Sequence, residues 1–218
     1  MHSINIGPEV IWFGHASFMI KGSKNIYIDP HVLPDKTEKA DIILVTHEHF
    51  DHCNAENIKK LRGEAKVLGP PGVMKKLGFG SPINIDSVKT IEGVKITGTD
   101  AYNTNKFRSP GSPFHPRGLG IGYLIEIGGK TIYHAGDTDN IPEMKNLGHV
   151  DIALLPIGGT YTMTVEEAAE AAKVIKPTIS IPMHYNSDKY GIAGINADPE
   201  EFARLAKGVD VKILTPLV

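Results

Sequence analysis

This sequence contains only one cysteine among its 218 residues, and that scarcity excludes two kinds of architecture. A single thiol cannot form an intramolecular disulfide, and it cannot supply the thiolates of a cysteine-rich zinc site. Cys53 stands beside a run of histidines, but nothing else in the sequence marks it as reactive. We interpret it as a packed thiol or one that supports a neighbouring ligand. Any metal in this chain therefore needs nitrogen and oxygen ligands.

Long apolar runs and blocks of like charge are also missing. No stretch approaches the roughly 18 consecutive apolar residues of a membrane-spanning helix, and residues 1–5 do not begin the basic-then-apolar pattern of a secretion signal. The formal net charge is -2, and no long run of lysines and arginines occurs. We therefore expect a cytoplasmic protein that acts on a small molecule, with no nucleic-acid or membrane partner; the oligomeric state stays open.

Short apolar runs separated by turn residues make up most of the chain, and 41% hydrophobic with 22% charged residues is typical of a globular protein. The first three runs predict an antiparallel meander, and the rest alternates strand and helix patterns in two similar halves. The predicted strands cover residues 10–13, 17–21, 25–28, 41–45, 65–68, 88–91, 94–97, 122–127, 131–134, 151–156, 178–182 and 211–214. The predicted helices cover residues 54–61, 72–77, 164–176 and 199–207. Two such halves meeting at their sheets predict an α/β fold, a four-layer αββα sandwich.

The helix expected at residues 164–176 has the clearest boundaries. Thr164 and Glu167 have the spacing of a capping box, in which each side chain binds a backbone amide at the start of the helix. Pro177 ends the helix, because proline cannot continue it.

Three histidines and an aspartate crowd together directly after the strand predicted at residues 41–45. His47 and His49 are two residues apart, so in extended backbone their side chains point to one side and can share a cation. Asp51 and His52 follow as the chain turns towards a helix, and they can reach a neighbouring position. Chance produces the pattern His-x-His-x-Asp-His on the order of once in a thousand such sequences. We interpret it as a metal-binding cluster whose spacing suits two cations.

Further ligands must come from other strand ends that reach the same edge. Asp137 follows a predicted strand and a glycine turn, which leaves its carboxylate able to bridge two cations, and His184 stands at the end of another strand. Together with the cluster, these positions predict a site for two divalent metal ions. Imidazoles and carboxylates without thiolate fit zinc, and manganese or iron can occupy the same set.

With these motifs in view, the sequence resembles the metallo-β-lactamase fold superfamily, and more narrowly the small metal-dependent hydrolases of the ascorbate-6-phosphate lactonase-like group. The resemblance covers the whole chain and is carried by residues 12–17, 28–30, 47–52, 136–138 and 182–184. It implies a single domain over residues 1–218, the αββα fold, and a dinuclear centre in the cleft at one edge of the two sheets.

The resemblance also implies a role for each ligand. The first metal takes His47 and His49, the second takes Asp51, His52 and His184, and Asp137 bridges them. The first metal needs a third histidine, which relatives place near residue 103, where this sequence has asparagine. His115 is the only histidine between residues 53 and 133, so we assign it as that ligand, although the loop must then fold back. Asn103 is predicted to contact the substrate.

Two residues near the N-terminus complete the predicted site. His15, in a Gly-His-Ala-Ser motif, is predicted to contact the substrate or to donate a proton, with a structural role as the alternative. Asp29 resembles an aspartate that holds a metal-binding histidine by its free ring nitrogen.

One long loop, residues 102–118, is rich in proline and glycine and has basic but no acidic residues. Loops of this length are often functional. Its Arg117, with Lys106 or Arg108 as further candidates, is predicted to pair with an anionic group of the substrate. A solvated charge is the alternative.

The chemistry expected from this site is hydrolysis. A hydroxide held between two divalent cations is available near neutral pH, so no serine or cysteine nucleophile is required, and Asp51 is predicted to orient it. The sequence therefore predicts a metal-dependent hydrolase, with a phosphodiester or phosphorylated lactone favoured over a neutral ester or amide. Two alternatives stay open: a diiron redox protein of the same fold, and a non-catalytic metal-binding protein.

Overall fold

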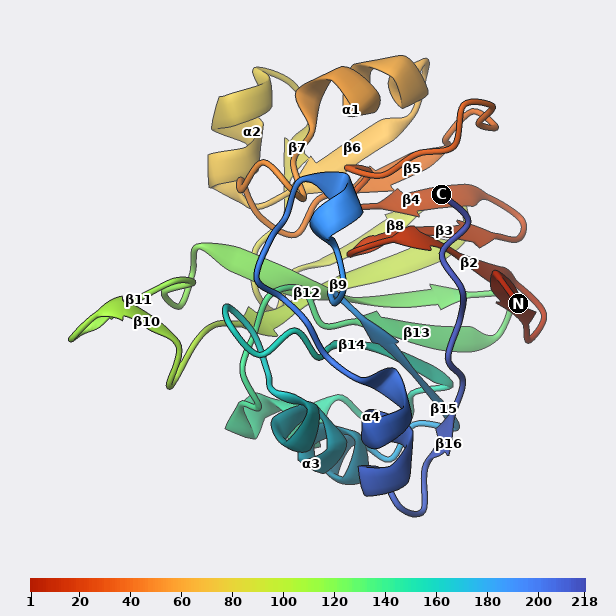
Figure 1. Cartoon of the computed structure of the whole chain (residues 1–218). Coiled ribbons are helices and arrows are strands. Elements are labelled where there is room, and N and C mark those ends of the chain that lie inside the picture. Colours follow the sequence, from red (N-terminus) through yellow and green to blue (C-terminus); the bar gives the residue numbers. More distant parts are fainter.

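Two seven-stranded sheets pack face to face, and two helices cover the outer face of each sheet (Figure 1). The computed structural model describes residues 1–218. These four layers confirm the α/β fold and the αββα sandwich that the alternation of patterns predicts. None of the helices combines the length and the apolar character that crossing a membrane requires.

The first sheet holds the N-terminal strands in sequence order. They are β1 (Ser3–Asn5), β2 (Glu9–Gly14), β3 (Ser17–Lys21), β4 (Asn25–Ile28), β5 (Ile42–Leu44), β6 (Lys66–Gly69) and β7 (Ser81–Pro82). Strands β1 to β4 pair antiparallel, as the predicted meander requires, and β4 to β7 pair parallel. The connecting helices α1 (Ala55–Arg62) and α2 (Pro71–Leu77) lie on the outer face of this sheet.

The second sheet is formed by the rest of the chain. Its strands, in spatial order, are β16 (Asp210–Val211), β15 (Ile179–Met183), β14 (Ile152–Pro156), β13 (Lys130–His134), β12 (Gly120–Ile127), β9 (Val94–Ala101) and β8 (Val88–Ile91). Helices α3 (Val165–Ile175) and α4 (Pro199–Leu205) cover its outer face, and short 3-10 helices occur at η1 (Pro142–Asn146) and η2 (Asp188–Tyr190).

Apolar side chains of both sheets fill the space between them. One cluster of 42 buried residues includes Trp12 from β2 and Leu154 from β14 and extends beneath α3. A second cluster of 14 buried residues packs under α1 and α2 and includes Cys53. Burial raises the pKa of the Cys53 thiol to about 11, which fits a packed thiol.

The sequence does not predict β1 or β7, and two predicted strands differ from the observed ones by more than two residues at one end. β9 continues past residue 97 to Ala101, because it pairs with β12 from Lys95 to Ala101. A Cβ atom at position 98 would lie 2.4 Å from the Asn84 carbonyl oxygen, so Gly98 allows this close approach. The strand predicted at residues 211–214 shrinks to β16, since the chain then crosses to the first sheet, where the Leu217 amide donates to the Trp12 carbonyl.

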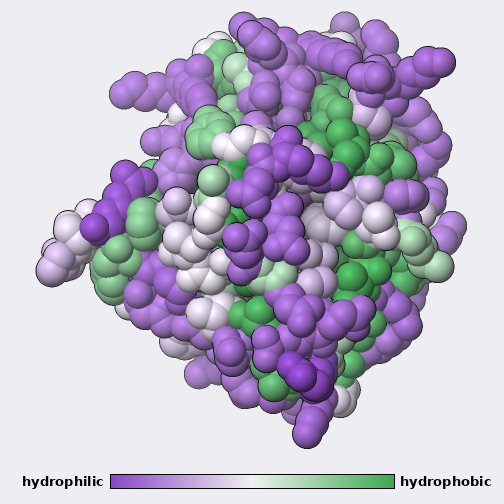
Figure 2. All heavy atoms as spheres, in the orientation of Figure 1, coloured by the Kyte–Doolittle hydropathy of each residue, from purple (hydrophilic) through white to green (hydrophobic).

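The long loop forms a projecting hairpin that the sequence does not predict. Strands β10 (Phe107–Ser109) and β11 (Ser112–Pro113) pair only with each other and stand clear of both sheets (Figure 1). In the space-filling view the hairpin extends from a largely hydrophilic face, with hydrophobic atoms near its base (Figure 2). Alternation of apolar and polar residues cannot predict β10 and β11, because the strands are short and turn residues stand at both ends.

The predicted capping box of α3 is present and also ties the hairpin to the helix. The Glu167 carboxylate accepts the Thr164 amide at 2.8 Å, and the Glu167 amide donates to the Thr164 hydroxyl at 3.3 Å. The same carboxylate accepts Lys106 Nζ at 2.7 Å and Asn105 Nδ2 at 2.5 Å. Glu167 therefore fixes the base of the loop that carries His115.

Replacing Glu167 with glutamine is expected to destabilise the fold by about 1–2 kcal/mol at neutral pH. Burial raises the pKa of Glu167, but the hydrogen bonds from Lys106, Thr164 and Asn105 outweigh it and bring the pKa below its usual 4.5. A carboxylate with a lowered pKa stabilises the fold above its unfolded pKa, and this contribution is lost as the pH falls through the folded value. Urea unfolding of both proteins should give free energies that converge below pH 4.5; a constant difference at all pH values contradicts the role of the charge.

Candidate metal centre

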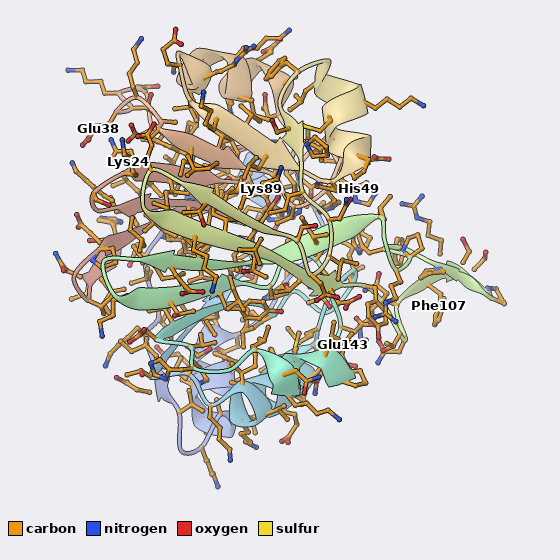
Figure 3. The ribbon with its side chains drawn as sticks, turned by 180° about the vertical axis from the view of Figure 1, so that it is seen from behind. Lys24, Glu38, His49, Lys89, Phe107 and Glu143 are labelled. Atoms are coloured by element: carbon orange, nitrogen blue, oxygen red, sulfur yellow. The ribbon has the colours of Figure 1, made fainter.

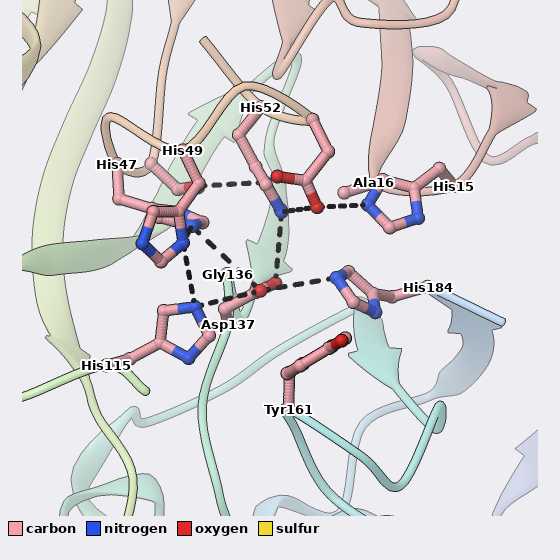
Figure 4. Close-up of polar contacts among 12 residues, drawn as sticks. His15, Ala16, His47, His49, His52, His115, Gly136, Asp137, Tyr161 and His184 are labelled. Atoms are coloured by element: carbon pink, nitrogen blue, oxygen red, sulfur yellow. Dashed lines mark hydrogen bonds and ion pairs between the residues drawn. The ribbon is translucent and has the colours of Figure 1, made fainter. Parts of the chain in front are cut away.

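Six strands end at the same edge of the two sheets, and the segment after each one carries a polar residue of the site. His15 follows β2, Asp29 follows β4, residues 47–52 follow β5, Asn103 follows β9, Asp137 follows β13 and His184 follows β15. The imidazole and carboxylate side chains labelled in Figure 4 meet in one place: His15, His47, His49, His52, His115, Asp137 and His184. His15, Asp29 and His184 have left-handed backbone, with φ of 51°, 44° and 58°. Such strained backbone persists only where its surroundings hold it, and it is concentrated at functional sites.

Three imidazoles form the first group of possible ligands. Nε2 of His47 lies 3.0 Å from Nδ1 of His49, and that nitrogen lies 3.2 Å from Nε2 of His115. The three nitrogens lie within 4.8 Å of one another. The structure thus brings together the three residues predicted for the first metal.

The outward nitrogens of two of these rings have fixed partners. Nδ1 of His47 lies 3.0 Å from the Thr46 hydroxyl, which itself donates to Asp29. Nδ1 of His115 lies 2.9 Å from the carbonyl oxygen of the Asn103 side chain. Both oxygens accept, so the hydrogen-bond network assigns the ring proton to Nδ1 and leaves the lone pair of Nε2 facing the centre. This is the tautomer that a metal-binding histidine needs.

A second group contains one carboxylate and three imidazoles. Its members are His15, Asp51, His52 and His184, whose ligand atoms lie within 4.8 Å of one another. His52 Nε2 lies 3.6 Å from Asp51 Oδ2, and His52 Nδ1 lies 2.6 Å from Asp29 Oδ2. Asp29 therefore turns the free ring nitrogen of His52 towards the centre, the support role that the sequence predicts for it.

Asp137 lies between the two groups. Its Oδ2 atom lies 3.2 Å from Nε2 of His115 and 3.2 Å from Nε2 of His184, and its Oδ1 atom lies 3.3 Å from Nε2 of His52. The preceding Gly136 has φ of 65°, and a Cβ atom there lies 2.9 Å from the Ile121 carbonyl. Only glycine makes this turn without strain, so the Gly-Asp pair places the carboxylate at the junction of the two groups.

The electrostatics of the centre favour cations. Burial lowers the pKa of His47 well below its usual value and lowers the pKa of His115 to about 4, so both rings are neutral at pH 7. Burial acts in the same direction on His52, but the carboxylates of Asp137, Asp29 and Asp51 outweigh it and raise the pKa of this ring. Three carboxylates that attract positive charge, next to the neutral rings of His47 and His115, suit a buried cation site.

Buried polar atoms without partners test whether a metal fits here. His52 Nε2, His184 Nε2 and Asp137 Oδ1 are buried and make no hydrogen bond. Buried polar groups are nearly always satisfied, and an ion is one of the few explanations when they are not. His52 and His184 belong to the second group, and Asp137 lies between the two groups, so the residues present fit divalent cations with nitrogen and oxygen ligands.

His115 reaches the first group because the loop folds back at its base. The Asn103 amide donates to the His115 carbonyl at 2.8 Å, and the His115 amide donates to the Asn103 side-chain oxygen at 2.8 Å. The nitrogen of the Asn103 side chain donates to Asp139 at 3.1 Å and to the Tyr161 carbonyl at 2.9 Å. Asn103, predicted to contact substrate, thus uses its whole amide to hold His115 and its neighbours.

His15, a member of the second group, is fully buried. Its Nε2 atom lies 3.2 Å from Asp51 Oδ2, its Nδ1 atom lies 3.0 Å from the Ser187 hydroxyl, and its carbonyl accepts the indole nitrogen of Trp12 at 2.9 Å. It does not line the open cavity described next. In this position His15 orients Asp51 directly, whereas contact with a substrate from the cavity requires passage past Asp51.

A cavity of about 510 Å³ opens above the centre, within the range that small-molecule sites occupy. His49, Asp51, His115 and Asp137 form its floor. Its walls are mostly apolar and come from separate segments: Phe50, Arg108, Phe114, Tyr161 and residues 191–193. Figure 3 shows His49 at the end of the sheets, on the side where the hairpin with Phe107 projects.

Arg117 does not reach this cavity. It donates to Asp100 at 2.8 Å and to Glu143 at 3.0 Å, beside a different groove on the second sheet. The sequence indicates a basic loop, but it does not indicate which of its basic side chains faces the site. The wall residues Phe50, Phe114 and Tyr161 were missed altogether, although Phe50, an aromatic residue between two expected ligands, carried a signal.

Known proteins of similar sequence are metal-dependent hydrolases. A family model described as a beta-lactamase superfamily domain matches residues 9–184. The UPF0173 metal-dependent hydrolase of Thermoplasma volcanium is 41% identical over 226 residues, which cover 96% of this chain and 96% of its relative. The chain belongs to the UPF0173 metal-dependent hydrolases of the beta-lactamase superfamily. This family membership confirms the predicted superfamily.

Solved structures agree with the family. A protein from Parabacteroides distasonis that is named a metal-dependent hydrolase has a TM-score of 0.83 and 35% identity, covering 95% of this chain and 92% of its own. A metallo hydrolase from Ignicoccus hospitalis has a TM-score of 0.78 and 30% identity, covering 96% of this chain and 95% of its own. The UPF0173 chain described here is therefore a metal-dependent hydrolase, and the predicted reaction class is confirmed.

Proposed function

We propose that this hydrolase binds two divalent metal ions, most simply zinc, and cleaves a phosphodiester or a phosphorylated lactone. One observation carries the proposal: two groups of inward-facing ligand atoms meet at the carboxylate of Asp137. His47, His49 and His115 would hold the first metal, Asp51, His52 and His184 would hold the second, and the Asp137 carboxylate would be available to both.

Divalent cations in such a site supply Lewis acidity and make water available as a nucleophile near neutral pH. The rest of the chemistry rests on the chain itself. Asp51 lies on the cavity floor, and its Oδ2 atom contacts His15. Burial raises the pKa of Asp51, but His52 and His15 together outweigh it, so the pKa lies below its usual value and the carboxylate stays ionised. Asp51 can therefore accept a hydrogen bond from the attacking water and orient it.

The supporting contacts give the site its rigidity. Asp29 and Asn103 hold His52 and His115 by their outward nitrogens, and Tyr123 donates to the Val45 carbonyl at 2.7 Å, which ties the loop after β5 to the second sheet. Ligands held in this way need no rearrangement when charge develops on the substrate, which is how electrostatic stabilisation becomes effective.

Elemental analysis followed by a substrate panel tests the proposal. Protein purified without chelators is expected to contain about two equivalents of metal per chain. Bis-(p-nitrophenyl) phosphate, a lactone and a β-lactam are then compared before and after chelation. Phosphodiester or lactone hydrolysis that chelation removes and added metal restores is the expected result. A single equivalent of metal contradicts the dinuclear assignment, and hydrolysis of the β-lactam alone contradicts the proposed substrate.

A further inference from the structure

The three cations of the long loop differ in whether they already have partners. Lys106 pairs with Glu167 at 2.7 Å, and Arg117 pairs with Asp100 and Glu143. Arg108 makes no salt bridge; its guanidinium stands 5.5 Å from the centre of the Phe114 ring. Arg108 is also the only one of the three that lines the cavity above the metal centre.

The walls next to Arg108 are built to receive an apolar group. The Phe114 and Tyr161 rings meet edge to face at 4.8 Å, so each holds the other in place. Across the cavity, Ile192 forms an apolar wall, and Thr160 donates to the Gly194 carbonyl at 2.7 Å, which joins the two walls. Phe50 lines the cavity with 62% of its surface exposed, and its ring meets the His31 ring edge to face at 5.9 Å, which leaves much of this large aromatic side chain free to contact a ligand.

We infer that the cavity takes a small oxyanion with an aromatic or aliphatic body, whose anionic group pairs with Arg108 while its body packs on Phe50, Phe114 and Tyr161. The inference rests on the proposed function, because the residues of the metal centre form the floor of the cavity that receives the ligand. It goes further by naming the substrate class and the residues that select it.

Charge and geometry favour Arg108 over its neighbours. A guanidinium forms two parallel hydrogen bonds to a phosphate or carboxylate, and it does so best when no protein carboxylate competes. Arg108 meets that condition, whereas Arg117 is already neutralised by two carboxylates. A phosphate and a carboxylate share the chemistry that this arginine recognises, so the experiment has an arm for each.

Binding of non-hydrolysable probes tests this inference without relying on turnover. Phenylphosphonate and methylphosphonate carry the same anion and differ in the body, and phenylacetate replaces the phosphonate with a carboxylate. Calorimetric titration of the metal-loaded protein is expected to give at least tenfold tighter binding of phenylphosphonate than of methylphosphonate. Benzamide, which has the body without the charge, is expected to bind at least tenfold more weakly than phenylphosphonate.

Three variants separate the contributions. Arg108→Gln is expected to weaken phenylphosphonate about tenfold, whereas Arg117→Gln, which removes the arginine favoured by the sequence, changes its affinity less than twofold. Phe50→Ser replaces an exposed side chain, so the fold survives, and it should weaken phenylphosphonate about threefold but leave methylphosphonate unchanged.

Three results overturn the inference. They are equal affinity for the two phosphonates, an Arg108→Gln protein that binds phenylphosphonate as the wild type does, and absence of any phosphonate binding. Metal content measured in the same samples distinguishes the causes. A wild-type protein that contains no metal contradicts the proposed function. A metal-loaded protein that does not bind phenylphosphonate contradicts only the inferred substrate class.

Discussion

Replacing His49 with alanine is expected to remove metal-dependent hydrolysis and to lower the affinity of the protein for its first metal at least a hundredfold. The reason is geometric, because Nδ1 of His49 is the atom that contacts both of the other imidazoles, at 3.0 Å from His47 and 3.2 Å from His115. Loss of a residue that merely supports a ligand already costs about 10–100-fold in metal affinity, so loss of a ligand should cost more.

The fold should survive this change. His49 is half-buried at the cavity floor and belongs to neither apolar cluster, so its removal leaves no cavity in the core. His149→Ala is the matched control: this imidazole is 73% exposed and contacts only Asp151, at 3.6 Å. Metal titration and turnover of both variants provide the measurement. A His49→Ala protein that keeps wild-type metal content and turnover refutes the assignment of the first site.

The ligand cluster could be predicted from sequence because its geometry is local. His47, His49, Asp51 and His52 lie within six residues after one strand, and short-range backbone geometry already confines them to one place. Asp137 and His184 could be added because strands of an αββα sandwich end at a shared edge, so a polar residue after a strand has few other places to lie.

The long loop was harder to predict because its geometry depends on contacts that are far apart in sequence. Three hydrogen bonds between His115 and Asn103 hold His115 at the centre, and the composition of residues 104–114 does not predict this closure of the loop. Arg108 and Arg117 look equivalent as letters in a basic loop. They differ because Asp100 and Glu143 lie beside Arg117 in the folded chain, and no periodic pattern reveals such partners.

The helices and strands show the same division between local and distant causes. The capping box of Thr164 and Glu167 predicts the first residue of α3 correctly, because the two residues that form it are only three positions apart in the sequence. By contrast, β9 extends through Gly98 because β12 pairs with it from Lys95 to Ala101, a tertiary effect that overrides the weak strand preference of glycine.

Replacing Asp29 with alanine is expected to destabilise the fold by about 3–5 kcal/mol and to weaken binding of the second metal by about 10–100-fold. Asp29 is fully buried and accepts three hydrogen bonds: from the Thr46 amide at 2.7 Å, the Thr46 hydroxyl at 2.6 Å and His52 Nδ1 at 2.6 Å. Alanine leaves all three donors buried without a partner, and it frees the His52 ring to turn away from the centre. In a domain of this size each kcal/mol lowers the melting temperature by about 2–4 °C.

Asp29→Asn separates charge from shape. Asparagine keeps the volume and tolerates the left-handed backbone at φ of 44°, but its amide nitrogen cannot accept one of the three donors, and it removes the negative charge beside His52. Its melting temperature should lie between those of the wild type and the alanine variant, with a loss of metal affinity close to that of alanine. Thermal unfolding in the presence of a chelator isolates the contribution of the fold, and competition with a chromogenic chelator measures the metal. An alanine variant that binds metal as tightly as the wild type contradicts the view that Asp29 orients His52. If the stability of that variant still falls as expected, the buried hydrogen bonds of Asp29 alone explain the loss of stability.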